Sequence, residues 1–170
     1  MKSKYCPIIA IDGDVDKSGV FTLYPDDRTY TAEALAFPHL LRYLKATKEA
    51  ADHFGDSAII VVEAGWLNQS NWHINSNPRT AAAIGNATGR NHEVGRKIVE
   101  CCKYFGLEVI EQKPLSKCWK GKDRKITLDE INQILANLGM EQLKTKNQEI
   151  LDATLLAINF ANLPIKLSAR

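Results

Sequence analysis

Acidic residues stand at three places where the surrounding sequence is apolar. Asp12 ends the first apolar run of the chain, and Glu63 ends the second. Asp152 lies in an apolar segment near the C-terminal end of the chain, one helical turn after Glu149. Taken singly, an acid at a strand end or on a helix is more often a solvated surface residue than a ligand. Their joint pattern is what suggests chemistry.

Carboxylates gathered at one place repel one another unless a cation neutralises them. The ends of adjacent strands in a sheet lie close together, and a flanking helix can point further acids toward them. Oxygen ligands without histidine or cysteine favour Mg²⁺ or Mn²⁺, and two such ions can activate a water and stabilise the leaving oxygen of a phosphodiester. The sequence therefore predicts catalytic residues that bind two Mg²⁺ ions, which Mn²⁺ can replace: Asp12, Glu63, Glu149 and Asp152.

The elements that must position these acids follow from hydrophobic periodicity and turn signals. We expect strands over residues 6–12, 20–24, 29–31, 57–63 and 107–110, and helices over residues 37–54, 78–105, 127–138 and 147–161. The first two strands should form an antiparallel hairpin, and the alternating units that follow should add parallel strands. This order predicts an α/β fold with a mixed five-stranded sheet and helices on both faces. A length of 170 residues suits a single domain over residues 1–170.

A basic segment lies between the last predicted strand and the final helices. The formal net charge of +2 is too small to indicate a nucleic-acid partner, but this segment contains one acid, Asp123, and an aromatic residue, Trp119, among its cations. Such a patch suits a phosphate backbone and an unstacked base, although a solvated loop would look the same. The predicted nucleic-acid-binding residues of the segment are Lys113, Lys117, Lys120, Lys122, Arg124 and Lys125.

Three further residues are candidates for contact with nucleic acid. Trp66 and Trp72 follow the second apolar run, where they could wedge into or stack on bases, or cover an edge of the core. Lys146 precedes the final helix and could neutralise a phosphate, with a plain surface lysine as the alternative.

In order and spacing, these acidic segments resemble the motifs of the RuvC-type Holliday-junction resolvases of the RNase H-like superfamily. Residues 11–19 resemble the first motif, in which an aspartate at a strand end is followed by a turn and a Ser/Thr-Gly pair. Residues 61–63 resemble the second, a glutamate that ends the central strand, and residues 147–153 resemble the third, an acid followed after two residues by Asp-Ala. The resemblance spans nearly the whole chain, although each motif alone is short.

The resemblance implies an RNase H-like fold and a Mg²⁺-dependent endodeoxyribonuclease that cleaves four-way junctions or other branched DNA as a homodimer. It also implies that Asp12, Glu63 and Asp152 are metal ligands, with Glu149 as the fourth acid. Two positions depart from the family: its common Asp-Pro-Gly is Asp-Gly-Asp here, and its fourth acid is often aspartate. Asp14, which stands at the second glycine's position, is either an added metal ligand or a turn residue.

Other readings remain open at this stage. The same site could act on an RNA–DNA hybrid, because fold alone does not determine substrate. A third possibility is an RNase H-like module that binds nucleic acid without cutting it. No apolar stretch reaches the ~20 residues that span a bilayer, and the N-terminal residues lack the pattern of a signal peptide, so we expect a cytoplasmic protein.

Overall fold

The computed structural model describes residues 3–68 and 77–167. Within them the strands form one mixed sheet with the order β3-β2-β1-β4-β5. The first three strands are an antiparallel meander, whereas β4 runs parallel to β1, and β5 runs parallel to β4. The strands are β1 (Ile8–Asp12), β2 (Ser18–Tyr24), β3 (Thr29–Leu35), β4 (Ile59–Glu63) and β5 (Glu108–Gln112).

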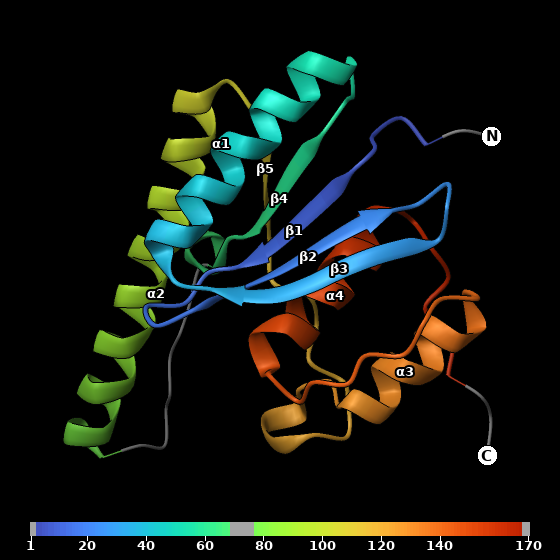
Figure 1. Ribbon diagram of the computed structural model, residues 1–170. Coiled ribbons are helices and arrows are strands. Elements are labelled where there is room, and N and C mark those ends of the chain that lie inside the picture. Colours follow the sequence, from blue (N-terminus) through green and yellow to red (C-terminus); the bar gives the residue numbers. More distant parts are fainter. Residues whose placement is uncertain (1–2, 69–76, 168–170) are drawn as a thin grey trace.

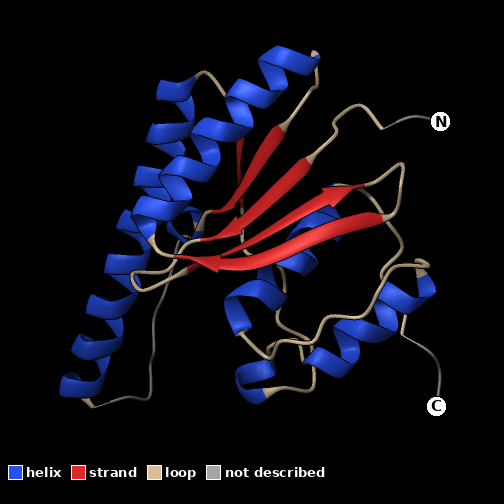
Figure 2. Cartoon of the chain, in the orientation of Figure 1, coloured by secondary structure: helices blue, strands red, loops and turns tan. Residues whose placement is uncertain are grey.

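Helices cover both faces of this sheet. Helices α1 and α2 pack on one face and α3 and α4 on the other, as Figure 1 and Figure 2 show. The predicted α/β fold, with a mixed five-stranded sheet and helices on both faces, is thereby confirmed. The helices are α1 (Phe37–Phe54), α2 (Pro78–Phe105), α3 (Leu128–Asn137) and α4 (Gln148–Phe160).

The two apolar runs that end in acids are the central strands, which are buried on both faces. In β1, Ile8 and Ala10 belong to the core beneath α3 and α4, while Ile9 and Ile11 belong to the core beneath α1 and α2. Residues of β4 alternate in the same way. Burial of each of these isoleucine side chains stabilises the folded protein by roughly 1.5–3 kcal/mol. These strands therefore hold their terminal residues on a rigid support.

The helix boundaries follow from local capping. Gly55 and Gly106 end α1 and α2 in the left-handed conformation, with φ of 73° and 74°. Helix α3 begins with a capping box between Thr127 and Glu130. The side chain of Asn147 caps α4 by accepting a hydrogen bond from the backbone N–H of Ile150 at 3.1 Å.

The expected third strand over residues 29–31 was too short, since β3 continues to Leu35. Tyr30, Ala32 and Ala34 alternate with exposed residues and pack against the core beneath α4. Alanine has little tendency to form strands, so packing and not propensity extends this strand. Two short 3-10 helices, η1 (Gly65–Leu67) and η2 (Lys122–Arg124), were not expected from the sequence. Trp72 lies outside the described residues, and no described helix has the length and apolar character to cross a membrane.

Candidate active site

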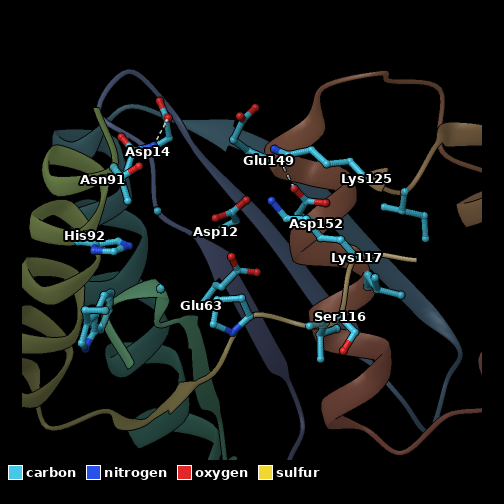
Figure 3. Close-up of a pocket in the computed structure, with 18 of the residues that line it drawn as sticks. Asp12, Asp14, Glu63, Asn91, His92, Ser116, Lys117, Lys125, Glu149 and Asp152 are labelled. Atoms are coloured by element: carbon cyan, nitrogen blue, oxygen red, sulfur yellow. Dashed lines mark hydrogen bonds and ion pairs between the residues drawn. The ribbon is translucent and has the colours of Figure 1, made fainter. Parts of the chain in front are cut away.

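A cavity of about 320 Å³ opens at one end of the sheet, between α4 and the middle of α2. Figure 3 shows Asp12 and Glu63 between these two helices, with Glu149 and Asp152 approaching from α4. All four acids that the sequence singled out therefore line one pocket, although they come from three separate elements.

The sheet topology explains why Asp12 and Glu63 are neighbours. Strands β1 and β4 are adjacent and parallel, and Ile11 pairs with Val62 in their register. The residue that follows each of these is the acid, so both carboxylates emerge at the same end of the sheet. A register shift of one residue would turn either acid to the opposite face.

A glycine in β2 allows α4 to approach the sheet closely enough to join the site. A Cβ atom on Gly19 would lie 2.1 Å from the carbonyl oxygen of Glu149. Any side chain at this position would push the first turn of α4 away from β2. The Ser-Gly pair that follows the acidic turn thus has a structural reason: it brings Glu149 and Asp152 to the ends of β1 and β4.

The acids of the pocket are half-buried, and the ionised form of each disfavours ionisation of its neighbours. Burial raises the pKa of the Asp12 carboxyl well above its usual range, and the nearby charges of Glu63 and Asp152 raise it further. Burial also raises the pKa of Glu63, again with a contribution from Asp152. Lys125 opposes the shift at both residues. Added positive charge would therefore stabilise the ionised form of this pocket.

Asp152 has specific partners for both of its carboxylate oxygens. Oδ1 accepts a hydrogen bond from the side-chain amide of Gln148 at 2.8 Å, and Oδ2 lies 3.5 Å from the ammonium of Lys125. Gln148 stands one turn before Asp152 on α4, so the two side chains share a helix face. Figure 3 shows Lys125 reaching toward Asp152 from the basic segment.

The donor chemistry of the pocket fits Mg²⁺, since Asp12, Glu63, Glu149 and Asp152 offer hard carboxylate oxygens. The raised pKa of Asp12 also indicates that a cation bound here would stabilise its ionised carboxylate. As the side chains stand in residues 3–68 and 77–167, no three His, Cys, Asp or Glu residues are close enough together to hold a metal ion. Binding would therefore require these carboxylates to converge further.

Two residues of the basic segment, Lys117 and Lys125, line the pocket together with Ser116. The charge of Lys117 lowers the pKa of Glu63, so this cation also acts on the acids. The remaining predicted cations are exposed and lie outside the pocket lining: Lys113, Lys120, Lys122, Arg124 and Lys146.

The basic segment is held in place by a buried carboxylate. Glu130 of α3 is 3% exposed, and it accepts hydrogen bonds from the backbone N–H groups of Lys120, at 3.2 Å, and Thr127, at 3.0 Å. The hydroxyl of Thr127 donates to the same carboxylate at 2.8 Å. Trp119 packs against the core beneath α3 and α4. The segment is thus an anchored loop that presents its lysines.

The opposite wall, from α2, presents neutral polar groups: Thr88, Asn91 and His92. The side-chain amide of Asn91 donates to Asp14 at 2.9 Å, so this acid, proposed from sequence as an added ligand or a turn residue, is engaged with α2. Its other oxygen accepts from the backbone N–H of Asp16 at 2.9 Å, as in a turn. Burial and the charge of Arg96 lower the pKa of His92, so its imidazole is neutral at pH 7.

Trp66 lines the pocket, and its side chain also packs against neighbouring residues of the core edge. Its indole N–H donates to Glu111 at 3.1 Å, its ring joins the core beneath α1 and α2, and Arg96 lies over the ring at 5.6 Å. A Cβ on Gly95 of α2 would lie 2.5 Å from the indole. These contacts favour the reading in which Trp66 covers an edge of the core, and its contact with bases stays a prediction.

Sequence reasoning missed the neutral groups of the pocket. Polar residues of ordinary spacing carry no signal of their own in the sequence, and four of them line the pocket: Thr88, Asn91, His92 and Ser116. Gln148 had a usable signal, because it stands at i−4 from Asp152 on a helix.

Comparisons with known proteins find a likeness in structure and none in sequence. No protein-family model matches the chain, and no curated protein matches its sequence. Among solved structures, the chain is similar to T. thermophilus RuvC in complex with Holliday junction substrate. The TM-score is 0.49 and the identity 15%, over 91% of this chain and 92% of that one. A likeness of this strength says nothing about residue roles, metals or substrate.

Proposed function

We propose that the protein is a metal-dependent endonuclease that cleaves phosphodiester bonds in structured DNA, with a four-way junction as its leading substrate. The observation that carries the proposal is the pocket itself. Four carboxylates from β1, β4 and α4 line it together with two lysines of the basic segment. Acids and cations in one cavity suit a reaction on a phosphate, which needs both metal ligands and groups that bind the anion.

In this proposal Asp12, Glu63, Glu149 and Asp152 hold Mg²⁺ or Mn²⁺. When bound, the metal would supply Lewis acidity to activate a water and to stabilise the leaving oxygen. The chain's own residues supply position and charge. Asp12 and Glu63 are fixed by buried strands, and α4 brings the other two acids to them through its close approach at Gly19.

Lys117 and Lys125 would bind the non-bridging oxygens of the phosphate that is cleaved, because their ammonium groups reach the same cavity. The exposed cations of the basic segment would bind neighbouring phosphates of the same strand. Lys146, at the start of α4, would extend this contact. Local cation density, and not the small net charge of +2, would attract the nucleic acid.

A homodimer would place two such pockets against one junction, which would allow symmetric cleavage of opposite strands. The partner would then be branched DNA, and the protein would need no further cofactor than the divalent metal. The dimer is part of the proposal and is tested with it.

The test is incubation of the purified protein with Mg²⁺ or Mn²⁺ and labelled four-way junction, fork, linear duplex and RNA–DNA hybrid. Asp12→Asn and Asp152→Asn are the inactive variants, and Asp16→Asn is the matched control, because Asp16 is exposed in the same turn and does not line the pocket. We expect paired nicks in the junction from the unchanged protein and from Asp16→Asn, and none from the other two.

Each other outcome assigns a different function. Cleavage of the hybrid alone would keep the metal site and replace the substrate. Binding of the junction with no cleavage of any substrate would make the protein a binding module. Cleavage that persists in Asp12→Asn and Asp152→Asn would show that the pocket is not the site.

A further inference from the structure

We propose that Lys125 is a built-in counter-cation of the acidic pocket, which holds Asp152 while no metal is bound and releases it to the metal. Lys125 would then be free to bind the phosphate of the substrate. The inference rests on the proposed function, since it concerns how the same pocket is loaded.

The first observation is the engagement of Asp152. Both of its oxygens have partners, Gln148 at 2.8 Å and Lys125 at 3.5 Å. The ion pair with Lys125 thus occupies a carboxylate oxygen that the proposed function assigns to the metal.

The second observation is the reach of the Lys125 charge. Besides its ion pair with Asp152, Lys125 lines the same cavity as Asp12 and Glu63, so its charge faces all three carboxylates. One ammonium thus offsets the repulsion among three carboxylates. A divalent cation in the same cavity would do so more strongly and would repel Lys125.

The third observation is that the backbone of Lys125 is held in a turn, whereas its side chain is partly exposed. Its backbone N–H donates to the carbonyl of Lys122 at 3.1 Å, and its carbonyl accepts from Gly121 at 2.9 Å. A Cβ on Gly121 would lie 2.5 Å from that carbonyl oxygen, so the turn is closely packed. The next residue, Ile126, is buried, whereas the Lys125 side chain is 37% exposed.

A lysine side chain that can bind either an internal carboxylate or a substrate phosphate couples the two binding events. Metal binding frees the ammonium for DNA, and DNA binding draws the ammonium away from Asp152 and so favours the metal. By linkage, each ligand raises the affinity for the other by the same factor.

The experiment is calorimetric titration of Mg²⁺ into the whole protein without DNA, for the unchanged chain and three variants. Lys125→Met keeps the aliphatic stem but removes the charge, and Lys125→Arg keeps the charge. Lys45→Met is the control, because Lys45 is exposed on α1, does not line the pocket and has no role in the proposed site. We expect Lys125→Met to bind Mg²⁺ about tenfold more tightly, since it removes a repelling charge. Lys125→Arg and Lys45→Met should bind like the unchanged protein.

A second titration, at fixed ionic strength, measures junction binding with and without Mg²⁺. It is made for the unchanged chain, for Lys125→Met and for the control variant Asp16→Asn. Mg²⁺ should tighten junction binding by the unchanged chain, and this gain should shrink in Lys125→Met. Lys125→Gln serves as the neutral variant if Lys125→Met does not fold.

Equal or weaker Mg²⁺ binding by the neutral variant would overturn this inference and leave the endonuclease proposal standing. Failure of the unchanged chain to bind Mg²⁺ or Mn²⁺ would overturn the metal-dependent function and, with it, the role of Lys125.

Discussion

The two walls of the pocket differ in the kind of chemistry they present. The charged wall, from α4 and the basic segment, consists of Glu149, Asp152, Lys117 and Lys125. The neutral wall, from α2, consists of Thr88, Asn91 and His92, whose lowered pKa keeps its imidazole uncharged at pH 7. Asp12 and Glu63 form the floor between them.

This difference separates two tasks that one cavity must perform. Charges in a poorly solvated place act on each other over several ångströms, so the charged wall and the floor control metal and phosphate. The neutral wall acts only through contact, as Asn91 does when it holds Asp14. Substitutions should therefore rank by the charge they change, from the floor, through the charged wall and its supports, to the neutral wall.

The floor should give the largest effect. We expect Asp12→Asn to reduce cleavage on the order of a thousandfold, because it removes a proposed metal ligand. The same change should raise the melting temperature without metal at pH 7, since burial and the neighbouring acids disfavour the charge of Asp12. Mg²⁺ should raise the melting temperature of the unchanged chain and not that of the variant.

Scanning calorimetry with and without Mg²⁺ makes this measurement, with Asp16→Asn as the control that changes neither property. A lower melting temperature for Asp12→Asn in the absence of metal would contradict the electrostatic account of the floor.

The two walls are each placed by a glycine, which allows a matched comparison of their rigidity. Gly19→Ala puts a Cβ 2.1 Å from the backbone of α4, which cannot yield, so we expect a loss of about 3 kcal/mol in unfolding free energy. Gly95→Ala puts its Cβ 2.5 Å from the Trp66 ring, which can move. It also gains about 1 kcal/mol of helix propensity, so the net loss should be smaller.

Urea unfolding of both variants measures the difference. Equal losses would show that the neutral wall is packed as rigidly as the charged wall, against the division proposed above.

The anchor of the basic segment should matter next. Glu130→Gln replaces a buried carboxylate with a neutral amide and so weakens the hydrogen bonds that it accepts from the backbone N–H groups of Lys120 and Thr127. We expect the free energy of unfolding to fall by about 2 kcal/mol. Junction binding should weaken as well, because the loop that presents Lys117 and Lys125 loses its support. Asp129→Asn, one residue earlier and exposed, is the control, and it should leave junction binding unchanged.

Within the charged wall, Lys117→Ala should lower junction affinity and reduce the slope of log affinity against log salt by about 0.9, the loss of one phosphate contact. Lys45→Ala, at an exposed position of α1 outside the pocket lining, should leave the slope unchanged. An unchanged slope for Lys117→Ala would mean that this lysine serves the acids and not the DNA.

The charged and neutral walls also differ in how well the sequence predicts them. Acids at the ends of apolar runs are conspicuous, because they interrupt a pattern, and the order of the elements follows from that same pattern. The fold class and the placement of Asp12, Glu63, Glu149 and Asp152 around one pocket were accordingly predictable. Their role as metal ligands stays a prediction.

The neutral wall was not predictable, because a polar residue on a helix looks the same whether it faces solvent or a cavity. Asn91 and His92 join the site only because α2 packs beside η1 at Gly95, which is a tertiary contact. Only part of the anchoring role of Glu130 could be predicted from the sequence. A Thr-x-x-Glu pattern before a helix indicates a capping box, but the bond of Glu130 to Lys120, ten residues earlier, depends on the path of the loop.

The neutral wall should give the smallest effect. Asn91→Ala removes one hydrogen bond to Asp14 and no charge, so we expect cleavage within about threefold of the unchanged protein and a loss of stability of about 1 kcal/mol or less. The salt dependence of junction binding should not change, since no phosphate contact is lost. Single-turnover cleavage and a salt titration measure both.

Asn91→Asp sharpens the same comparison, because it keeps the size of the side chain and gives the neutral wall a charge beside Asp14. If the neutrality of α2 is what the site requires, this variant should bind junction DNA more weakly and melt at a lower temperature than Asn91→Ala, and Mg²⁺ should restore part of both losses. If instead Asn91→Ala alone costs as much as Lys117→Ala, then α2 contacts the substrate directly. The two walls would then share the work of binding the phosphate, and charge would not be what distinguishes them.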